Sequence, residues 1–515
     1  MAKKETRFNK TKRFSDIRTE CSAEISLPDY NTDVRKILHV SAEPHQISSF
    51  ASGDGIECSG EVTFDLVYLD FEGNVSSASF GGDYSFKVKC DTESYKDSLV
   101  ETSLDNLSVR LMSPRKVAAK ATLDSSVTVV TEQTVEVSGD AFADELGYVV
   151  DPVCISVKTT EITAAAEREY GAVLARYDGK TTDEVALIHL SAKPRVERID
   201  LSDGEAEIVG KIDVEALVKT DEYPLIRLTK SLDLSQKISA PELCEEGDLQ
   251  ADVEVASASV AIQGDEGGVE LALSVITESR LLREGNSSVE LYSDMYLCDF
   301  PCECQKETLS YDEYLGRWSH NKEISETVAV ADLGIGALRE IAFADATVKL
   351  REVSVADGAA CVLADILVSA IATEVNDDGV ATFVPVKFPV KIKENVNCDC
   401  QIDDKTAIIA DVRLNDLSVT ADSEFVHFKA NISPTVSLTQ SKEAEALVRA
   451  EAKLSMPYNK KASRVTVYYP TEEDTLYTIA KAYHTTKERI LNDNPALSEA
   501  SVGGDLASFG KLIIT

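Results

Sequence analysis

Two short cysteine motifs are the residues in this sequence with the most reactive side chains. "CDFPCEC" holds Cys298, Cys302 and Cys304, and "CDC" holds Cys398 and Cys400. Thiolates at such spacing can hold zinc. However, alternate residues of a strand lie on the same face, and no histidine accompanies either motif. The pattern therefore favours free thiols, or thiols that cross-link neighbouring proteins once reducing power is lost, and we expect no metal.

The sequence offers no recognisable set of catalytic residues. The six histidines have no metal-ligand spacing, and there is no glycine-rich phosphate loop, nucleophile elbow or His-Glu-x-x-His motif. Carboxylates are so numerous that no acid pair stands out. We therefore expect a protein that is not an enzyme and needs no cofactor.

Charge narrows the classes of partner. The chain of 515 residues has 89 acidic and 52 basic residues, a net charge of −37. This argues against nucleic acid and anionic membranes, both of which attract basic patches. The start, "MAKKETRFNKTKRFSDIR", is basic but has no apolar segment, so it predicts a solvated tail and not a secretory signal. No apolar run reaches the ~18 residues that a membrane span needs. With no export signal, we expect a cytosolic protein with reduced thiols.

A repeat of about 150 residues organises most of the chain. An alternating strand and turn recur with Gly60, Gly210 and Ala364 aligned, at spacings of 150 and 154 residues. Asp140-Ala-Phe and Asp294-Met-Tyr form a second landmark, 154 residues apart. The same spacing of 154 separates three cysteines in polar connections: Cys90, Cys244 and Cys398.

The repeats predict a mainly β protein. Apolar residues alternate, for example Val62, Phe64 and Leu66, and turn residues recur at short intervals. This pattern is typical of half-buried antiparallel strands in a sandwich or barrel. We expect three tandem sandwich-like or barrel-like β repeats followed by a small βααβ domain. The predicted limits are 1–165 with a basic N-terminal tail, 166–310, 311–445, a linker at 446–463, and the last domain at 464–515.

The last 52 residues are close to neutral and have helical signals. The sequence predicts a strand at 464–469, a first helix N-capped by Asp474, and a second helix that ends near Asp493. "TTKE" fits a capping box in which the Thr485 hydroxyl and Glu488 satisfy the first amides of the second helix. "KLIIT" predicts a closing strand at 511–515. In the first helix, the buried stripe is expected at Leu476, Ile479, Ala480 and Tyr483, which leaves Tyr477 off the stripe.

This terminal segment resembles a LysM domain. It supplies the Asp-Thr-Leu, Ile-Ala, Tyr-x-Thr and Asn features of that family and a closing Gly510-Lys-Leu-Ile-Ile. The resemblance implies a groove between two loops. Its residues here are Asp474, Thr475, Leu476, Tyr477, Asn494, Pro495, Ala496 and Leu497. Glu473 stands where the family has glycine and the closing proline is absent, and both departures weaken the case for the sugar contact usual for the family.

The β repeats resemble SPOCS domains of endospore-coat proteins. The similarity rests on "ISLPDYNTDVRKILHV", on "SPRKVAAKATL", and on the Asp140-Ala-Phe and Asp294-Met-Tyr turns. SPOCS repeats combined with a C-terminal LysM domain resemble the clostridial coat-morphogenesis proteins. That resemblance implies a non-enzymatic scaffold in the mother-cell cytoplasm, at the forespore surface. Its LysM domain would dock on the coat basement-layer ATPase, stage IV sporulation protein A, and its β repeats on other coat proteins.

A second hypothesis is a peptidoglycan-binding protein. In that case the terminal domain would bind N-acetylglucosamine glycan and anchor the β scaffold to the cortex or cell wall. The same groove residues would serve either partner, so the sequence leaves both partners open.

Overall fold

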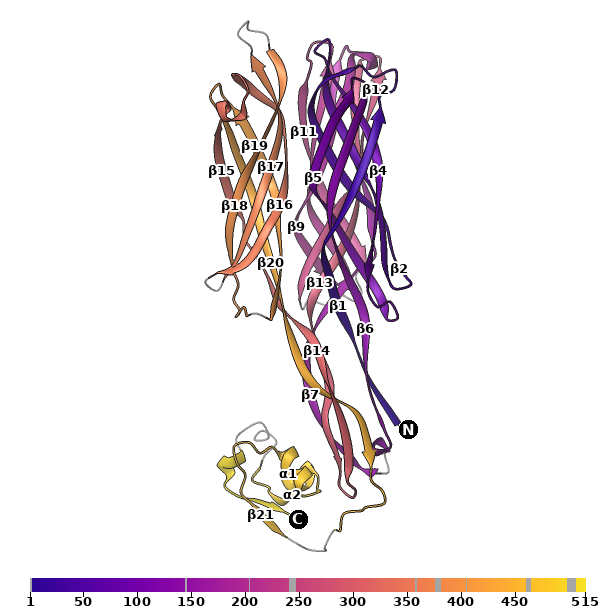
Figure 1. Ribbon diagram of the computed structural model, residues 1–515, viewed down its shortest axis with the longest axis vertical. Helices are drawn as coiled ribbons and strands as arrows, with labels where there is room; N and C mark the ends of the chain where they lie inside the picture. The colour runs from indigo at the N-terminus through magenta and orange to yellow at the C-terminus, as the bar shows by residue number, and fades with distance from the viewer. Residues whose placement is uncertain are drawn as a thin grey trace.

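The computed structural model describes residues 2–143, 146–202, 204–239, 247–356, 359–375, 381–403, 405–459, 465–497 and 506–515. The protein is mainly β, with 77% of residues in strands, 6% in helices and several separate sheets. The mainly β prediction is thereby confirmed. Long strands run along the longest axis, and the short helices α1 and α2 lie near one end (Figure 1). None of the described helices is long and apolar enough to cross a membrane.

Strands β1 to β6 form the first pairing set. Their bounds are β1 (Ala2–Ser26), β2 (Val34–Ser52), β3 (Gly55–Asp70), β4 (Val75–Lys89), β5 (Tyr95–Ser113) and β6 (Lys116–Gly139). β6 pairs antiparallel with β1 and β5, and β3 lies between β2 and β4. The short 3-10 helix η1 (Asp140–Phe142) follows.

The prediction of a solvated basic tail at the N-terminus is wrong. β1 pairs with β6 from Ala2 opposite Gly139 to Ser26 opposite Lys116, with one register shift. Its basic side chains lie largely outward, whereas Phe8 is buried among apolar residues of the other two sets. The segment is an amphipathic strand despite its basic residues, because lysine and arginine on the exposed face of a strand cost little folding free energy.

Strands β7 to β13 form the second set. Their bounds are β7 (Tyr148–Ile162), β8 (Ala166–Asp178), β9 (Val185–Ser202), β10 (Glu205–Thr220), β11 (Ile226–Ser239), β12 (Asp248–Asp265) and β13 (Gly268–Leu297). β13 pairs with β7, β8 and β12, and β10 lies between β9 and β11. The 3-10 helix η3 (Thr182–Glu184) precedes β9.

Strands β14 to β20 form the third set. Their bounds are β14 (Cys302–Ser319), β15 (Lys322–Ala329), β16 (Leu338–Ala356), β17 (Ala359–Val375), β18 (Ala381–Asn397), β19 (Thr406–Ala421) and β20 (Phe425–Ala452). β20 pairs with β14, β15 and β19, and β17 lies between β16 and β18. The 3-10 helix η4 (Val330–Leu333) follows β15. The predicted limits at 165 and 310 fall after β7 and within β14, and β20 extends into the predicted linker.

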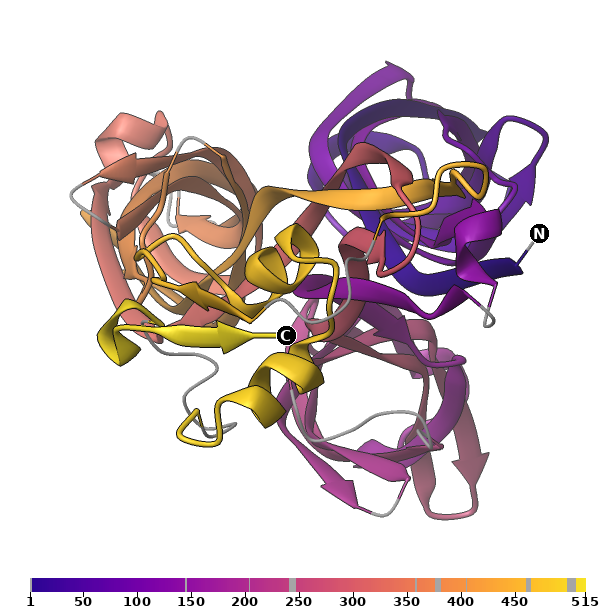
Figure 2. The ribbon, with the colours of Figure 1, turned by 90° about the horizontal axis from the view of Figure 1, so that it is seen from below.

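The three sets lie side by side around a common centre (Figure 2). One group of contacts between the sets runs in one direction around this centre. β2 contacts β17 and β18, β9 contacts β3 and β4, and β16 contacts β11. One strand of each set, namely β2, β9 or β16, therefore contacts the three-stranded sheet of another set. Together these contacts form a closed head-to-tail ring within one chain.

Three aromatic rings meet at this centre, one from each set. His39 of β2, His189 of β9 and Phe343 of β16 are spaced by 150 and 154 residues, the period of the repeats. Their ring centroids lie 5.0–5.7 Å apart with edge-to-face geometry. All three are buried. His39 Nδ1 lies 3.1 Å from Ser369 Oγ. Burial lowers the pKa of His39 to about 4 and also lowers that of His189.

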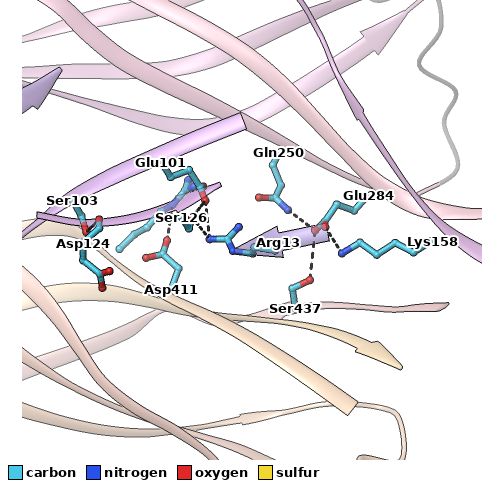
Figure 3. A network of polar contacts seen from close by, with 11 residues as sticks. Arg13, Glu101, Ser103, Asp124, Ser126, Lys158, Gln250, Glu284, Asp411 and Ser437 are labelled. Carbon is cyan, nitrogen blue, oxygen red and sulfur yellow. Dashed lines mark hydrogen bonds and ion pairs between the residues drawn. The ribbon is translucent and has the colours of Figure 1, made fainter. Parts of the chain in front are cut away.

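A polar network contains side chains from all three sets (Figure 3). Lys158 of β7 and Glu284 of β13 form a buried ion pair with Nζ and Oε1 2.7 Å apart. The third set faces this pair: Ser437 hydroxyl donates to Glu284 at 3.5 Å, and Lys158 donates to Thr439 Oγ1 at 3.3 Å. The ammonium also lies over the Tyr314 ring. Hydrogen-bonded partners on both sides are what a buried ion pair requires.

The C-terminal segment forms a small separate unit, called here the terminal module (residues 465–515). Its described elements are β21 (Thr466–Tyr468), α1 (Leu476–Ala482), α2 (Lys487–Asp493), the 3-10 helix η6 (Leu506–Phe509) and β22 (Leu512–Ile514). β21 and β22 pair antiparallel. The module lies at the end of the long β assembly, beside the tips of β7 and β14 (Figure 1).

Candidate functional site

The caps of both module helices differ from the prediction by one residue. Thr475, not Asp474, is the N-cap of α1, and its hydroxyl accepts from the Thr478 amide at 3.1 Å. Asp474 instead accepts from the Thr471 amide at 2.7 Å and the Tyr468 hydroxyl at 3.0 Å. These contacts, the Thr471 amide first, lower the pKa of Asp474. Asp474 therefore braces the turn before the helix and does not cap it.

α2 is capped by Thr486, whose hydroxyl accepts from the Arg489 amide at 3.2 Å. The predicted capping box of Thr485 and Glu488 is wrong, because Thr485 is buried and faces the β assembly. Two adjacent threonines give the same sequence signal. Tertiary contact selects which of them turns inward. The predicted end of α2 near Asp493 is confirmed.

Leu476 and Tyr477 are both buried, so the expectation that Tyr477 lies off the buried stripe is wrong. Leu476 packs with Ile479 and Ile490 inside the module. Tyr477 packs edge-on against Tyr296 of β13, with ring centroids 5.3 Å apart. This burial raises the pKa of Tyr477. The β assembly therefore covers part of the side of α1 that points away from the core of the module.

The second group of predicted residues follows α2. The Asn494 side chain donates to the carbonyls of Ile513 at 2.6 Å and Ile490 at 2.7 Å, and it accepts from the Ile513 amide at 2.7 Å. Asn494 therefore joins the end of α2 to β22. Leu497 is buried in the same core as Leu476 and Tyr477, whereas Pro495 and Ala496 are exposed.

The predicted groove residues are thus only partly brought together. Three of them lie in the small hydrophobic core of the module: Leu476, Tyr477 and Leu497. The side chains of Asp474 and Asn494 are engaged inside the module. Thr475, Pro495 and Ala496 remain exposed. Most of the predicted groove residues therefore stabilise the module instead of facing solvent.

The terminal module is held against the second set by polar and aromatic contacts. The Tyr296 hydroxyl donates to the Thr485 carbonyl at 2.7 Å, and Lys481 pairs with Asp294 at 2.5 Å. Tyr458, after β20, stacks on His484 with centroids 3.6 Å apart. These contacts place the outer side of α1 on the β assembly and leave the β21–β22 side of the module away from it.

We predict that Tyr296→Phe loosens this contact by about 1 kcal/mol, since it removes one buried hydrogen bond and leaves the Thr485 carbonyl without that donor. Hydrogen exchange at the amides of α1 and α2 is expected to rise about fivefold, while exchange in β17 stays constant. The exposed Tyr30 offers a matched control as Tyr30→Phe. Unchanged exchange in both helices would contradict the role given to this bond.

The β21–β22 side of the terminal module carries a strip of exposed apolar side chains, called here the apolar strip. It comprises Val465, Val467, Tyr469 and Ile513, with exposed fractions of 67%, 51%, 68% and 39%. The first three alternate along the chain, so they share one face, and Val467 pairs with Ile513 across the two strands. The alternation in "RVTVYY" could have revealed this strip; the prediction concentrated on the helix loops instead.

Cys90, Cys302, Cys304 and Cys398 form no disulfide in the described structure. Cys302 and Cys304 lie with their sulfurs 3.8 Å apart, whereas Cys90 and Cys398 are half-buried and separate. Cys244 lies outside the described residues. Among the described residues, no group of three or more histidine, cysteine or acidic side chains is placed to hold a metal ion.

One surface hollow of about 320 Å³ lies at the end of the third set. Its lining residues are Trp318, Ser319, His320, Asn395, Val396 and Asn397. An indole face with two amides suits stacking and hydrogen bonding more than nucleophilic catalysis. The His320 Nε2 lies 3.7 Å from a carboxylate oxygen of Glu394.

Comparison with known proteins found no family model, no curated protein and no solved structure that matches this chain. The functional argument therefore rests on the residues and their geometry.

Proposed function

We propose that this chain is a non-enzymatic scaffold of the spore coat. In this proposal the three strand sets are copies of one SPOCS-like, barrel-like β domain, and the terminal module is a LysM-like domain. The β assembly forms a long acidic body that presents docking faces to other coat proteins. The module docks on the coat basement-layer ATPase, a protein like stage IV sporulation protein A, in the mother-cell cytoplasm at the forespore surface.

The observation that carries this proposal is the apolar strip on the terminal module. Val467 of β21 and Tyr469, which directly follows β21, are both more than half exposed. Exposed apolar side chains gathered on one face mark interaction sites, and tyrosine is among the commonest anchors of protein interfaces. The strip therefore supports a protein partner for the module.

The arrangement of the sets supports the scaffold part of the proposal. Gly60, Gly210 and Ala364 lie in β3, β10 and β17, each the central strand of a three-stranded sheet. The head-to-tail ring of contacts arranges the three sets around one axis. A long body of this kind suits a protein that spaces its partners.

The test is capture of the coat ATPase by the full-length protein. Val467→Glu places a charge in the middle of the apolar strip and is expected to weaken capture at least about tenfold. Val355→Glu is the matched control, because Val355 is a comparably exposed strand valine in the third set. Capture by Val355→Glu should equal that of the unmodified protein. Equal capture by both variants would remove the strip from the proposal.

Peptidoglycan binding is the alternative function, and it has a test of its own. A glycan groove would draw on Asp474 and Asn494, whose side chains are engaged in internal hydrogen bonds. Their commitment favours the protein partner. Binding of N-acetylglucosamine oligomers to the full-length protein, if tight and lost in Thr475→Ala, would instead support an anchor on cortex or cell wall.

A further inference from the structure

Two thiols lie side by side at the start of β14. Cys302 and Cys304 are alternate residues of the strand, so both side chains lie on one face, and their sulfurs are 3.8 Å apart. Their strand partners on β20 are the alanines Ala452 and Ala450. Small partners leave both sulfurs room to move toward each other.

The surroundings of this pair make one sulfur the better nucleophile. The Cys302 thiol faces Cys304 and lowers the pKa of Cys304 to about 7, while the pKa of Cys302 is raised. The Cys304 thiol donates to the Met295 carbonyl at 3.4 Å, and the Lys481 ammonium of the terminal module lowers the pKa of Cys304 while Asp294 raises it. Both cysteines are half-buried, so small solutes can reach them. Because the pKa of Cys304 is lowered and that of Cys302 is raised, Cys304 is the sulfur that more readily becomes a thiolate, the form that attacks disulfides.

We propose that Cys302 and Cys304 form a reversible dithiol–disulfide site that reacts with small organic disulfides. The Cys304 thiolate attacks one sulfur of the organic disulfide and expels the other half as a thiolate. Cys302 then loses its proton, attacks the Cys304 sulfur and expels the second half. Two protein thiols and one organic disulfide become one protein disulfide and two small thiols, so the protein is oxidised and the organic disulfide is reduced.

The backbone makes such a bond possible but labile. Alternate Cα atoms of a strand lie about 6.4–6.8 Å apart, at the upper end of the range that a disulfide spans. A bond closed across this distance stores strain and is easily reduced. This geometry fits a reversible site and not a permanent structural crosslink.

The second motif of the same spacing provides a matched comparison within the chain. Cys398 and Cys400 follow β18, outside any strand, and burial raises the pKa of both. The Cys398 thiol donates to the Val396 carbonyl at 3.6 Å. These cysteines have the same spacing as the β14 pair, but in the described structure their sulfurs do not face each other. Comparing the two pairs therefore shows whether the spacing alone or the close approach of the sulfurs gives the reactivity.

The experiment treats full-length protein with oxidised glutathione at pH 7, blocks the remaining thiols and identifies peptides by mass spectrometry. We expect a bond between Cys302 and Cys304, reversed by reduced glutathione. Formation should be about threefold or more faster than any modification of Cys398 and Cys400. Cys302→Ser should instead accumulate a glutathione adduct on Cys304. Reaction of Cys304 no faster than Cys398, or adducts on both cysteines without closure, would overturn the proposal.

Discussion

Replacing Glu284 with alanine is expected to lower the free energy of unfolding by about 3–5 kcal/mol, the largest stability effect we predict. The Lys158 ammonium, which is buried, would lose its carboxylate at 2.7 Å and keep only Thr439 and the face of Tyr314. An unpaired buried charge is costly because the low-dielectric surroundings cannot replace its hydration. The measurement is the midpoint and slope of urea unfolding for the variant and the unmodified protein.

A double variant separates the lost attraction from the stranded charge. Lys158→Met with Glu284→Leu removes both charges at similar volume and is expected to be less destabilising than Glu284→Ala alone. The comparison also tests the junction between sets, because Ser437 and Thr439 of β20 face this pair. If the single variant costs under about 1 kcal/mol, water reaches Lys158 and the pair does not seal the junction.

The sequence correctly predicted a mainly β protein because the period-two alternation of apolar residues in strands is a local property. Gly60, Gly210 and Ala364, noticed only as recurring letters, now have a physical reason. Each lies on a central strand beside a register shift in its pairing with the neighbouring strand. A Cβ on Gly60 or Gly210 would approach a backbone oxygen of that neighbour to 2.4 Å or 2.1 Å. A bulge that brings two backbones together requires a small residue there.

The remaining errors come from contacts between distant segments. Tyr477 lies at a position that an isolated helix would expose, but Tyr296, far earlier in the chain, covers it. Thr486 and not Thr485 caps α2 for the same reason, because the Thr485 carbonyl accepts a hydrogen bond from the Tyr296 hydroxyl. Phe8 is likewise buried because residues of the second set pack against it. Local periodicity carries no information about such partners, so these residues could not be placed from sequence alone.

The axis of the assembly yields the second large prediction, a loss of stability in acid that depends on His39. Its pKa falls from the usual 6.5 to about 4 because the folded protein buries the ring. The unfolded chain therefore binds more protons than the folded protein between these two pH values. Folding stability is present above about pH 6.5 and is lost as pH falls toward 4, by about 3 kcal/mol for this group. His189, also lowered by burial, acts in the same direction.

The third repeat already contains the variant that tests this. Phe343 occupies the position that corresponds to His39 and His189, and it packs edge-on against both rings. His39→Phe should therefore fit the axis and reduce the stability lost between pH 7 and pH 4.5 by about 2–3 kcal/mol in urea unfolding. Phe343→His should increase that loss. Both changes keep the surrounding charges, Asp345, Lys193 and Lys387, so the difference between variants isolates the ring. If all three proteins lose the same stability in acid, the imidazoles already gain protons in the folded state, and the axis is open to water rather than sealed.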